Sequence, residues 1–182
     1  MSEKYKVIDS KVPTFVTITI VDWVDLLIRP VYCKIIDDSL NYCIKEKGLT
    51  VYAYVYMSSH IHLIVTANGD DLQNVIRDFK KFTSKKLIEA IMEYPESRRT
   101  WLLKKFSYEA RRSGRALNFK VWKDGFHPII LDTLEKIEQK VGYIHNNPVR
   151  AEIVFHERDY VNSSYRSYEE GNGDGCNVNI KL

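Results

Sequence analysis

The chain has 182 residues, of which 45% are hydrophobic and 28% are charged, and its formal net charge is +3. This apolar content is enough for one domain with a sizeable core. The cysteines, Cys33, Cys43 and Cys176, show no CxxC spacing, which argues against a zinc ribbon or a disulfide framework and favours free thiols in a reducing compartment. Neither a signal peptide nor an apolar run that spans a bilayer is evident, so we expect a cytoplasmic protein with no membrane partner.

The first third of the chain predicts a strand followed by a helix. Residues 1–11 form a polar leader without a clear pattern, and the β-branched run Thr14–Ile20 predicts the first strand. Residues 31–47 carry apolar side chains at helical spacing, and Gly48 is a natural end for that helix.

A pair of histidines stands out in the next segment, TVYAYVYMSSHIHLIVT, which covers residues 50–66. It predicts two short strands joined at Ser58-Ser59, with His60 and His62 on the second. Side chains on a strand alternate between its two faces, so both imidazoles project from the same face. Neutral imidazole is the commonest metal ligand, and the pair therefore indicates a divalent metal site that needs a further ligand.

A long amphipathic helix is predicted from about Leu72 to Met92, with Asp70 or Asp71 as its N-cap. The apolar residues expected to face inward are Leu72, Val75, Ile76, Phe79, Phe82, Leu87, Ile88 and Ile91. The opposite side is basic and carries Arg77, Lys80, Lys81, Lys85 and Lys86. A charged face of this kind is usually a solvated surface.

Residues 98–123 combine basic and aromatic side chains. Nine basic residues accompany one acid, Glu109, and five aromatic residues are interleaved with them. Basic charge binds phosphates and aromatic rings stack on unpaired bases, although the same pattern also fits a helix and loop with core aromatics and solvated charges. The candidate DNA-binding residues of the chain are Arg77, Lys80, Lys81, Arg98, Arg99, Lys104, Lys105, Arg111, Arg112, Arg115, Lys120, Trp122 and Lys123.

The last part of the chain predicts two strands and a helix. Residues 123–126 predict a tight turn between strands at 119–122 and 126–131. The helix 133–147 begins with Asp132 and Glu135 at capping-box spacing, and Pro148 is expected to end it. The Gly- and Asn-rich last dozen residues predict a frayed tail, and no linker divides the chain, so we expect a single domain with its core at about 14–168.

One face of the helix 133–147 carries polar groups that suit a metal site. Tyr143 and Asn147 are spaced by four residues and share a face, and Gln139 lies one turn earlier. If this helix covers the histidine-bearing face of the sheet, then His60, His62 and one amide oxygen form a three-ligand site beside a tyrosine. The amide oxygen favours a hard metal such as Mg²⁺ or Mn²⁺.

This constellation suits chemistry on a phosphodiester. A metal on the non-bridging oxygens stabilises the charge that develops during attack. A tyrosine in line with the phosphorus acts as nucleophile and leaves a covalent phosphotyrosine and a free DNA hydroxyl. Because the covalent bond preserves the energy of the broken linkage, this chemistry suits strand transfer better than digestion.

The chain resembles the REP-associated tyrosine transposases, a branch of the single-tyrosine HUH transposase-like family. The resemblance covers about residues 14–168 and rests on pieces in the family's order: TFVTITI, YVYMSSHIHLIV, LQNVIRDFKKFTSKKL, VWKDGFHPII, GYIHNNPVRAEIV and DYVNSSY. It implies a ferredoxin-like α/β (α+β) sandwich with a central antiparallel sheet and packed helices. It also implies metal-dependent nicking and joining of single-stranded DNA, often near hairpin-forming repeats.

The resemblance also implies roles for individual residues. His60 and His62 match the HUH metal ligands, Tyr143 matches the nucleophile, and Asn147 matches the asparagine of the Tyr-Ile-x-x-Asn-Pro motif, which implies a third ligand. Gln139 remains an alternative third ligand, because the position before a proline is biased away from helical geometry.

Other functions stay open on the sequence alone. A domesticated, catalytically silent protein that binds DNA or RNA hairpins would keep the same fold and basic surface. A metal-dependent hydrolase that uses water would keep the metal ligands without needing Tyr143. The expected partner is single-stranded or hairpin DNA, and the protein is expected to be a monomer or a homodimer.

Overall fold

The computed structural model describes residues 9–68 and 71–170. The expectations for the end of the chain, and for most of the leader, lie outside these ranges. Within them, no helix is both long and apolar enough to cross a membrane. Cys33 and Cys43 are buried free thiols, as the cysteine spacing predicts for these two.

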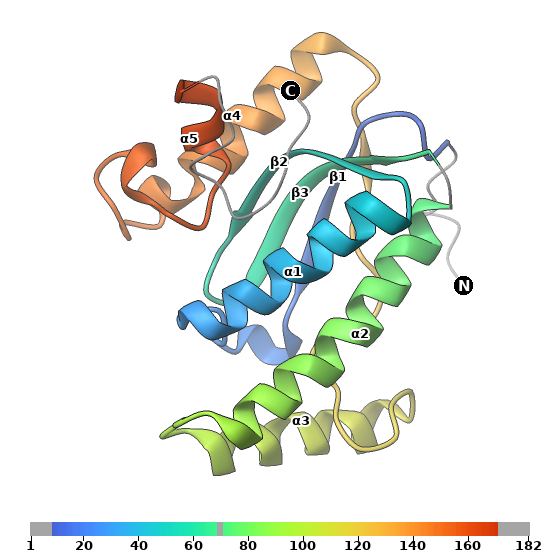
Figure 1. Cartoon of the computed structure of the whole chain (residues 1–182), viewed down its shortest axis with the longest axis vertical. Helices are drawn as coiled ribbons and strands as arrows, with labels where there is room; N and C mark the ends of the chain where they lie inside the picture. The colour runs from blue at the N-terminus through green and yellow to red at the C-terminus, as the bar shows by residue number, and fades with distance from the viewer. Residues whose placement is uncertain (1–8, 69–70, 171–182) are drawn as a thin grey trace.

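A four-stranded antiparallel sheet forms the centre of the molecule (Figure 1). Its strands, in the order in which they lie across the sheet, are β2 (Leu49–Tyr56), β3 (His60–Ala67), β1 (Thr14–Thr19) and β4 (Ile129–Ile130). The helices are α1 (Pro30–Glu46), α2 (Leu72–Glu93), α3 (Arg99–Ser113), α4 (Leu134–Arg150) and α5 (Tyr165–Glu170), with short 3-10 turns η2 (Val21–Trp23) and η3 (Glu157–Asp159). The expected ferredoxin-like architecture is confirmed.

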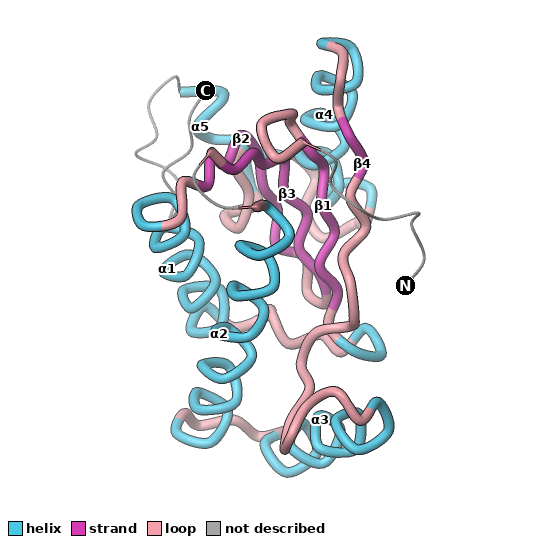
Figure 2. Tube along the Cα trace, turned by 90° about the vertical axis from the view of Figure 1, so that its right-hand side faces the viewer, coloured by secondary structure: helices cyan, strands magenta, loops and turns pink. Residues whose placement is uncertain are grey.

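The two faces of the sheet bury different clusters, because strand side chains alternate. The larger cluster joins Val16, Ile18, Ile61 and Leu63 to α1 and α2, which lie side by side on one face (Figure 2). The smaller cluster, on the other face, includes Phe15, Ala53, Val55 and Ile64 and packs against Ile144 of α4. His60 and His62 have the same parity as Ile64, so the histidines face α4.

The segment after α3 differs from the predicted hairpin. Only Ile129–Ile130 forms a strand, and Trp122 makes a single bridge to Ile20. The segments 119–122 and 126–131 do not pair with each other. Instead both lie along β1, because Lys123 N donates to Thr19 O over 2.8 Å and Leu131 N donates to Pro13 O over 2.8 Å. The turn between them is therefore a bend along the edge of the sheet.

Helix α4 departs from its predicted ends. Its N-cap is Thr133, whose hydroxyl accepts from Lys136 N, whereas Asp132 forms an ion pair with the Lys136 side chain. Pro148 lies inside the helix and does not end it at Asn147. Proline removes the hydrogen bond that its missing N–H would have made, and the Pro148 ring is buried against the protein.

On α2, one inward-facing assignment is wrong: Phe82 is 53% exposed and Thr83 is fully buried. The buried Thr83 hydroxyl has a partner both as hydrogen-bond donor and as acceptor. It donates to Phe79 O over 2.7 Å and accepts from Trp122 Nε1 over 2.9 Å. The bond to Trp122 attaches the 119–123 segment to α2.

His145 fixes α4 against the edge of the sheet. Its Nε2 shares a hydrogen bond of 2.9 Å with Ser164 Oγ, which also accepts from the backbone N–H of Tyr54 on β2. The imidazole is 6% exposed and packs edge-on against Tyr165 and Tyr168. Burial lowers the pKa of His145 from 6.5 to about 4, and the nearby Glu157 carboxylate opposes this only in part.

We expect His145 to make the protein less stable in mild acid. A neutral buried imidazole stabilises the fold fully above the unfolded pKa of 6.5, and this contribution is lost as pH falls towards about 4. The loss amounts to at most about 3 kcal/mol, at about 1.4 kcal/mol for each pH unit between the two pKa values. Urea unfolding from neutral pH to about pH 4 should therefore be less steeply pH-dependent in His145→Gln. The exposed His156→Gln control should keep the wild-type slope; equal slopes in all three proteins would contradict the prediction.

Candidate active site

The structure places His60 and His62 side by side, with ring centroids 4.7 Å apart. Hydroxyl groups hold one nitrogen of each ring: Thr17 Oγ1 lies 2.9 Å from His62 Nδ1, and Ser59 Oγ lies 3.2 Å from His60 Nδ1. In the tautomer that carries hydrogen on Nδ1, this nitrogen donates to the hydroxyl and Nε2 keeps its lone pair. Partners of this kind orient imidazoles for metal binding.

Both imidazoles are held in the neutral form that binds metals. Burial, together with the neighbouring His60 and the Lys140 ammonium, lowers the pKa of His62 to about 3. Burial also lowers the pKa of His60. No proton therefore has to leave either ring at neutral pH before a metal binds.

Tyr143 reaches this site from α4. Its ring lies edge-on to His62, with centroids 5.5 Å apart, and edge-on to Phe15 at 5.9 Å. Phe15 stacks on His62, with ring centroids 5.1 Å apart, and therefore contacts both the histidine and the tyrosine rings. Two cations flank the phenol ring: Lys140 Nζ lies 5.2 Å from its centroid and the Arg150 guanidinium 5.9 Å.

The two candidate third ligands occupy different environments. Asn147 is half-buried one turn after Tyr143, and the continuation of α4 through Pro148 keeps it on the tyrosine face. Gln139, one turn before Tyr143, is exposed. Across residues 9–68 and 71–170, no three His, Cys, Asp or Glu side chains gather as a metal site. Two neutral imidazoles with an amide oxygen fit a divalent cation.

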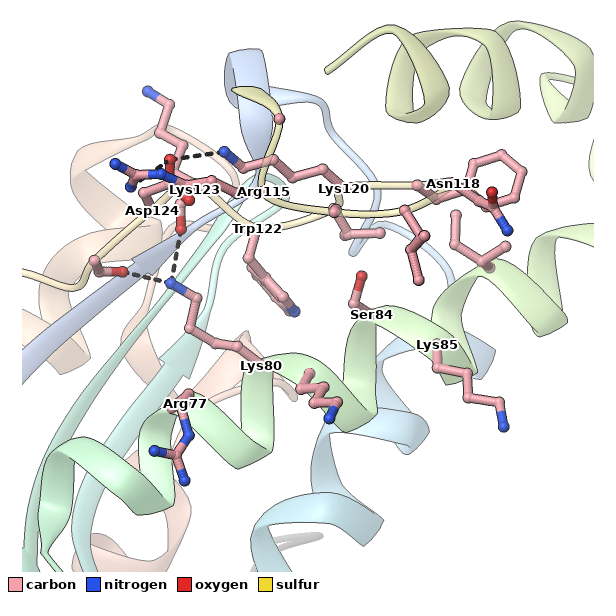
Figure 3. Close-up of a pocket in the computed structure, with 18 of the residues that line it drawn as sticks. Arg77, Lys80, Ser84, Lys85, Arg115, Asn118, Lys120, Trp122, Lys123 and Asp124 are labelled. Carbon is pink, nitrogen blue, oxygen red and sulfur yellow. Dashed lines mark hydrogen bonds and ion pairs between the residues drawn. The ribbon is translucent and has the colours of Figure 1, made fainter. Parts of the chain in front are cut away.

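Part of the basic surface lines a cavity of about 970 Å³ between α2 and residues 114–125 (Figure 3). Lys80 closes one end of it from α2. Its Nζ donates to the carbonyl oxygens of Lys123 and Gly125, over 2.7 and 2.5 Å, and burial lowers its pKa to about 8. Lys80 thus holds the bend at 123–125, while Lys81 and Lys85 stand exposed on the same helix.

Many of the candidate DNA-binding cations already have partners. Ion pairs join Arg77 to Asp78, Arg98 to Asp25 and Glu96, Lys105 to Asp22, Arg112 to Glu109, and both Arg115 and Lys120 to Asp124. Arg99 donates to the carbonyls of Ile91 and Tyr94, and Arg111 donates to Ser107. Trp122 is 4% exposed and offers no free ring for a base. Of these candidates, Lys81, Lys104 and Lys123 have neither an ion pair nor a side-chain hydrogen bond within the described ranges.

Several residues of the site were missed from the sequence, although signals for them existed. Lys140 and Arg150 lie three residues before and seven after Tyr143, on the same helix face. Thr17 stands opposite His62 in the sheet register, which becomes apparent only once β1 is paired with β3. Phe15 lies two residues earlier on the same face of β1 and could have been found in the same way.

Comparison with known proteins identifies the family. A family model described as IS200-like transposase matches residues 27–147, which is more than half of the chain and includes the two histidines, Tyr143 and Asn147. The chain therefore belongs to the IS200-like transposase family. No curated protein matches the chain.

Solved structures confirm the fold. A REP-associated tyrosine transposase bound to a REP hairpin is similar over 94% of this chain and 87% of that chain, at 19% identity and a TM-score of 0.67. A protein from Deinococcus radiodurans R1, described as a transposase, matches over 80% of this chain and 97% of that one, at 15% identity and a TM-score of 0.46. The first likeness supports the fold assignment, whereas the second is too distant to add to it.

Proposed function

We propose that this protein is a metal-dependent enzyme that nicks single-stranded DNA and transfers the strand, with Tyr143 as nucleophile. One observation carries the proposal: the Tyr143 ring packs against His62 of a neutral histidine pair, although helix and strand are far apart in the sequence. Membership of the IS200-like transposase family supports it.

His60, His62 and Asn147 would hold the metal, Mg²⁺ or Mn²⁺. When bound, the metal would neutralise the non-bridging oxygens of the phosphate that is attacked. Lys140 and Arg150 add positive charge around Tyr143, which attracts the phosphate. Phe15 contacts both the His62 and the Tyr143 rings and helps to fix their positions.

The reaction exchanges one ester for another. The Tyr143 oxygen forms a bond to phosphorus as its proton leaves to solvent, and the bond from phosphorus to one deoxyribose oxygen breaks. That oxygen takes up a proton and becomes a free DNA hydroxyl, while the other strand end stays attached to Tyr143. Attack by another DNA hydroxyl reverses these steps and joins the strand to a new end.

The proposed substrate is DNA with a hairpin and a single-stranded arm. Its support is the fold shared with a protein whose structure was solved on a REP hairpin, together with the exposed Lys81 and Lys104 and the half-buried Lys123. A catalytically silent hairpin-binding protein is the alternative, and the same experiment separates the two.

A covalent-adduct assay tests the proposal. Labelled hairpin oligonucleotides from the DNA that flanks the gene are incubated with protein and Mn²⁺ or Mg²⁺ and run on a denaturing gel. We expect a labelled protein band that disappears with chelator and is absent in Tyr143→Phe. Cleavage without an adduct would instead support a hydrolase that uses water, and binding without cleavage would support the silent protein. Either result would overturn the proposal.

A further inference from the structure

Two consecutive residues next to the histidine pair have left-handed backbone geometry. Asp22 has φ 50° and Trp23 has φ 55°, a region that side chains other than glycine rarely occupy. The segment is fixed on both sides: Val21 and Val24 are buried in the main core, and Val21 N donates to Val121 O over 2.8 Å. The surrounding core thus enforces a conformation that costs free energy, a pattern that clusters at functional sites.

The left-handed turn directs a large aromatic side chain outward. While the flanking valines are buried, Trp23 is 57% exposed. Its ring lies edge-on to His60, with centroids 5.3 Å apart, so it borders the histidine pair on the side away from Tyr143's contact with His62. An exposed indole held beside a catalytic site is unusual, because burial of such a ring would stabilise the fold.

A lysine without an ion-pair partner in the described part of the chain lies over this indole. Lys123 Nζ lies 4.8 Å from the centre of the Trp23 ring and forms no ion pair within the described ranges. The Lys105 ammonium, bonded to Asp22, lowers the pKa of that carboxyl, and the charges of Arg112 and Lys123 act in the same direction. An anionic ligand with a flat apolar part matches this combination of a cation and an exposed ring.

We propose that Trp23 is a stacking platform for one unpaired nucleobase of the DNA arm next to the phosphate that is attacked, with Lys123 contacting the adjacent phosphate. The inference rests on the proposed function for the position of the DNA. Every base has a flat π-face, and an indole binds such a face while a nearby lysine binds the backbone. The fixed turn holds the ring in place before DNA arrives, which lowers the ordering cost of binding.

Trp101 provides a matched control. It is 51% exposed, on α3, and is part of the same basic and aromatic stretch, but its ring has no described contact with the histidine pair. Both tryptophans would therefore respond alike to nonspecific DNA binding. Only Trp23 should respond to a base placed beside the active site.

The experiment uses the full chain carrying Tyr143→Phe, so that binding is measured without chemistry. The probes are the flanking-DNA hairpins with 2-aminopurine at one arm position at a time. We expect quenching at one position on binding, lost in Trp23→Ala and retained in Trp23→Phe and Trp101→Ala. Affinity should fall by about 5- to 150-fold in Trp23→Ala, the range for loss of one stacked base.

Each outcome decides the proposal. Quenching that persists in Trp23→Ala with unchanged affinity overturns the platform, even where the parent protein forms its adduct. Loss of Mn²⁺ binding in Trp23→Ala assigns the indole a packing role against His60 and also overturns it. Quenching that depends on Trp23 supports the platform even if no adduct forms, which would refute the tyrosine chemistry alone. Absence of all DNA binding refutes both the stacking platform and the tyrosine chemistry.

Discussion

His62→Ala is expected to abolish the covalent adduct and to weaken Mn²⁺ binding by more than about 100-fold, beyond the loss usually caused by a residue that only orients a ligand. His62 is at the centre of the site, in contact with Phe15, His60 and Tyr143. Its loss removes a neutral nitrogen donor and the surface against which the phenol packs. Titration calorimetry with Mn²⁺ and the denaturing-gel assay measure the two effects.

The hydroxyl behind His62 provides a graded test of the same site. Thr17→Val removes the partner of Nδ1 but leaves the ring, so Mn²⁺ affinity should fall by about 10- to 100-fold. Thr14→Val is the matched control on the same strand, because the Thr14 hydroxyl bonds to Val12 O, away from the histidines. A His62→Ala protein that is folded by circular dichroism and still forms a metal-dependent adduct would disprove the assignment.

Glu96→Ala is expected to destabilise the protein by about 1–3 kcal/mol, the range for leaving a buried polar group without its partner. The Glu96 side chain has no exposed surface. Its carboxylate lies 2.8 Å from Arg29 Nε and accepts from Tyr32 Oη over 3.0 Å and from Arg98 N over 2.9 Å. Loss of the carboxylate leaves the fully buried Tyr32 hydroxyl without its acceptor.

Urea denaturation measures the effect, and Asp25→Ala is the control. Asp25 also forms an ion pair with Arg98, at 2.6 Å, but its side chain is 54% exposed, so its loss should cost less than about 1 kcal/mol. Equal losses in the two variants would contradict the prediction.

We expect acid to remove the stabilisation that the Glu96 carboxylate provides. Burial raises the pKa of Glu96, but the hydrogen bonds from Arg98 N and Tyr32, with the charges of Arg29 and Arg98, lower it overall. The contribution is therefore complete above the ordinary value of 4.5 and is lost as pH falls through the lower folded pKa.

Local patterns were sufficient to predict the main elements and the central pair of the site. Alternation along β3 places His60 and His62 on one face, and the spacing of four places Tyr143 and Asn147 on one helix face. These are properties of a single strand or helix. The contact between Tyr143 and His62 required one further step, the side of the sheet that α4 covers, and the resemblance to a known family supplied this.

Features that depend on distant partners were not predictable in the same way. Thr83 replaces Phe82 in the core because its hydroxyl bonds to Trp122, which is 39 residues away. Lys105 pairs with Asp22 across the fold, and no spacing rule connects those positions. The segments 119–122 and 126–131 each have the composition of a strand. Composition does not reveal, however, that both lie along β1 and that they do not pair with each other. The role of Trp23 likewise depends on a backbone conformation that composition does not reveal.

The division of the core into two clusters separates the parts of the site. The histidines belong to the sheet, and the large cluster with α1 and α2 packs against the other face of that sheet. Tyr143 belongs to α4, which is held by the smaller cluster and by the hydrogen bond between His145 and Ser164. Less deeply packed elements open more often than the whole protein unfolds. Detachment of α4 would withdraw Tyr143 while the two imidazoles stay in place. Under the proposed function, the site would therefore be complete only while this helix is docked on the sheet.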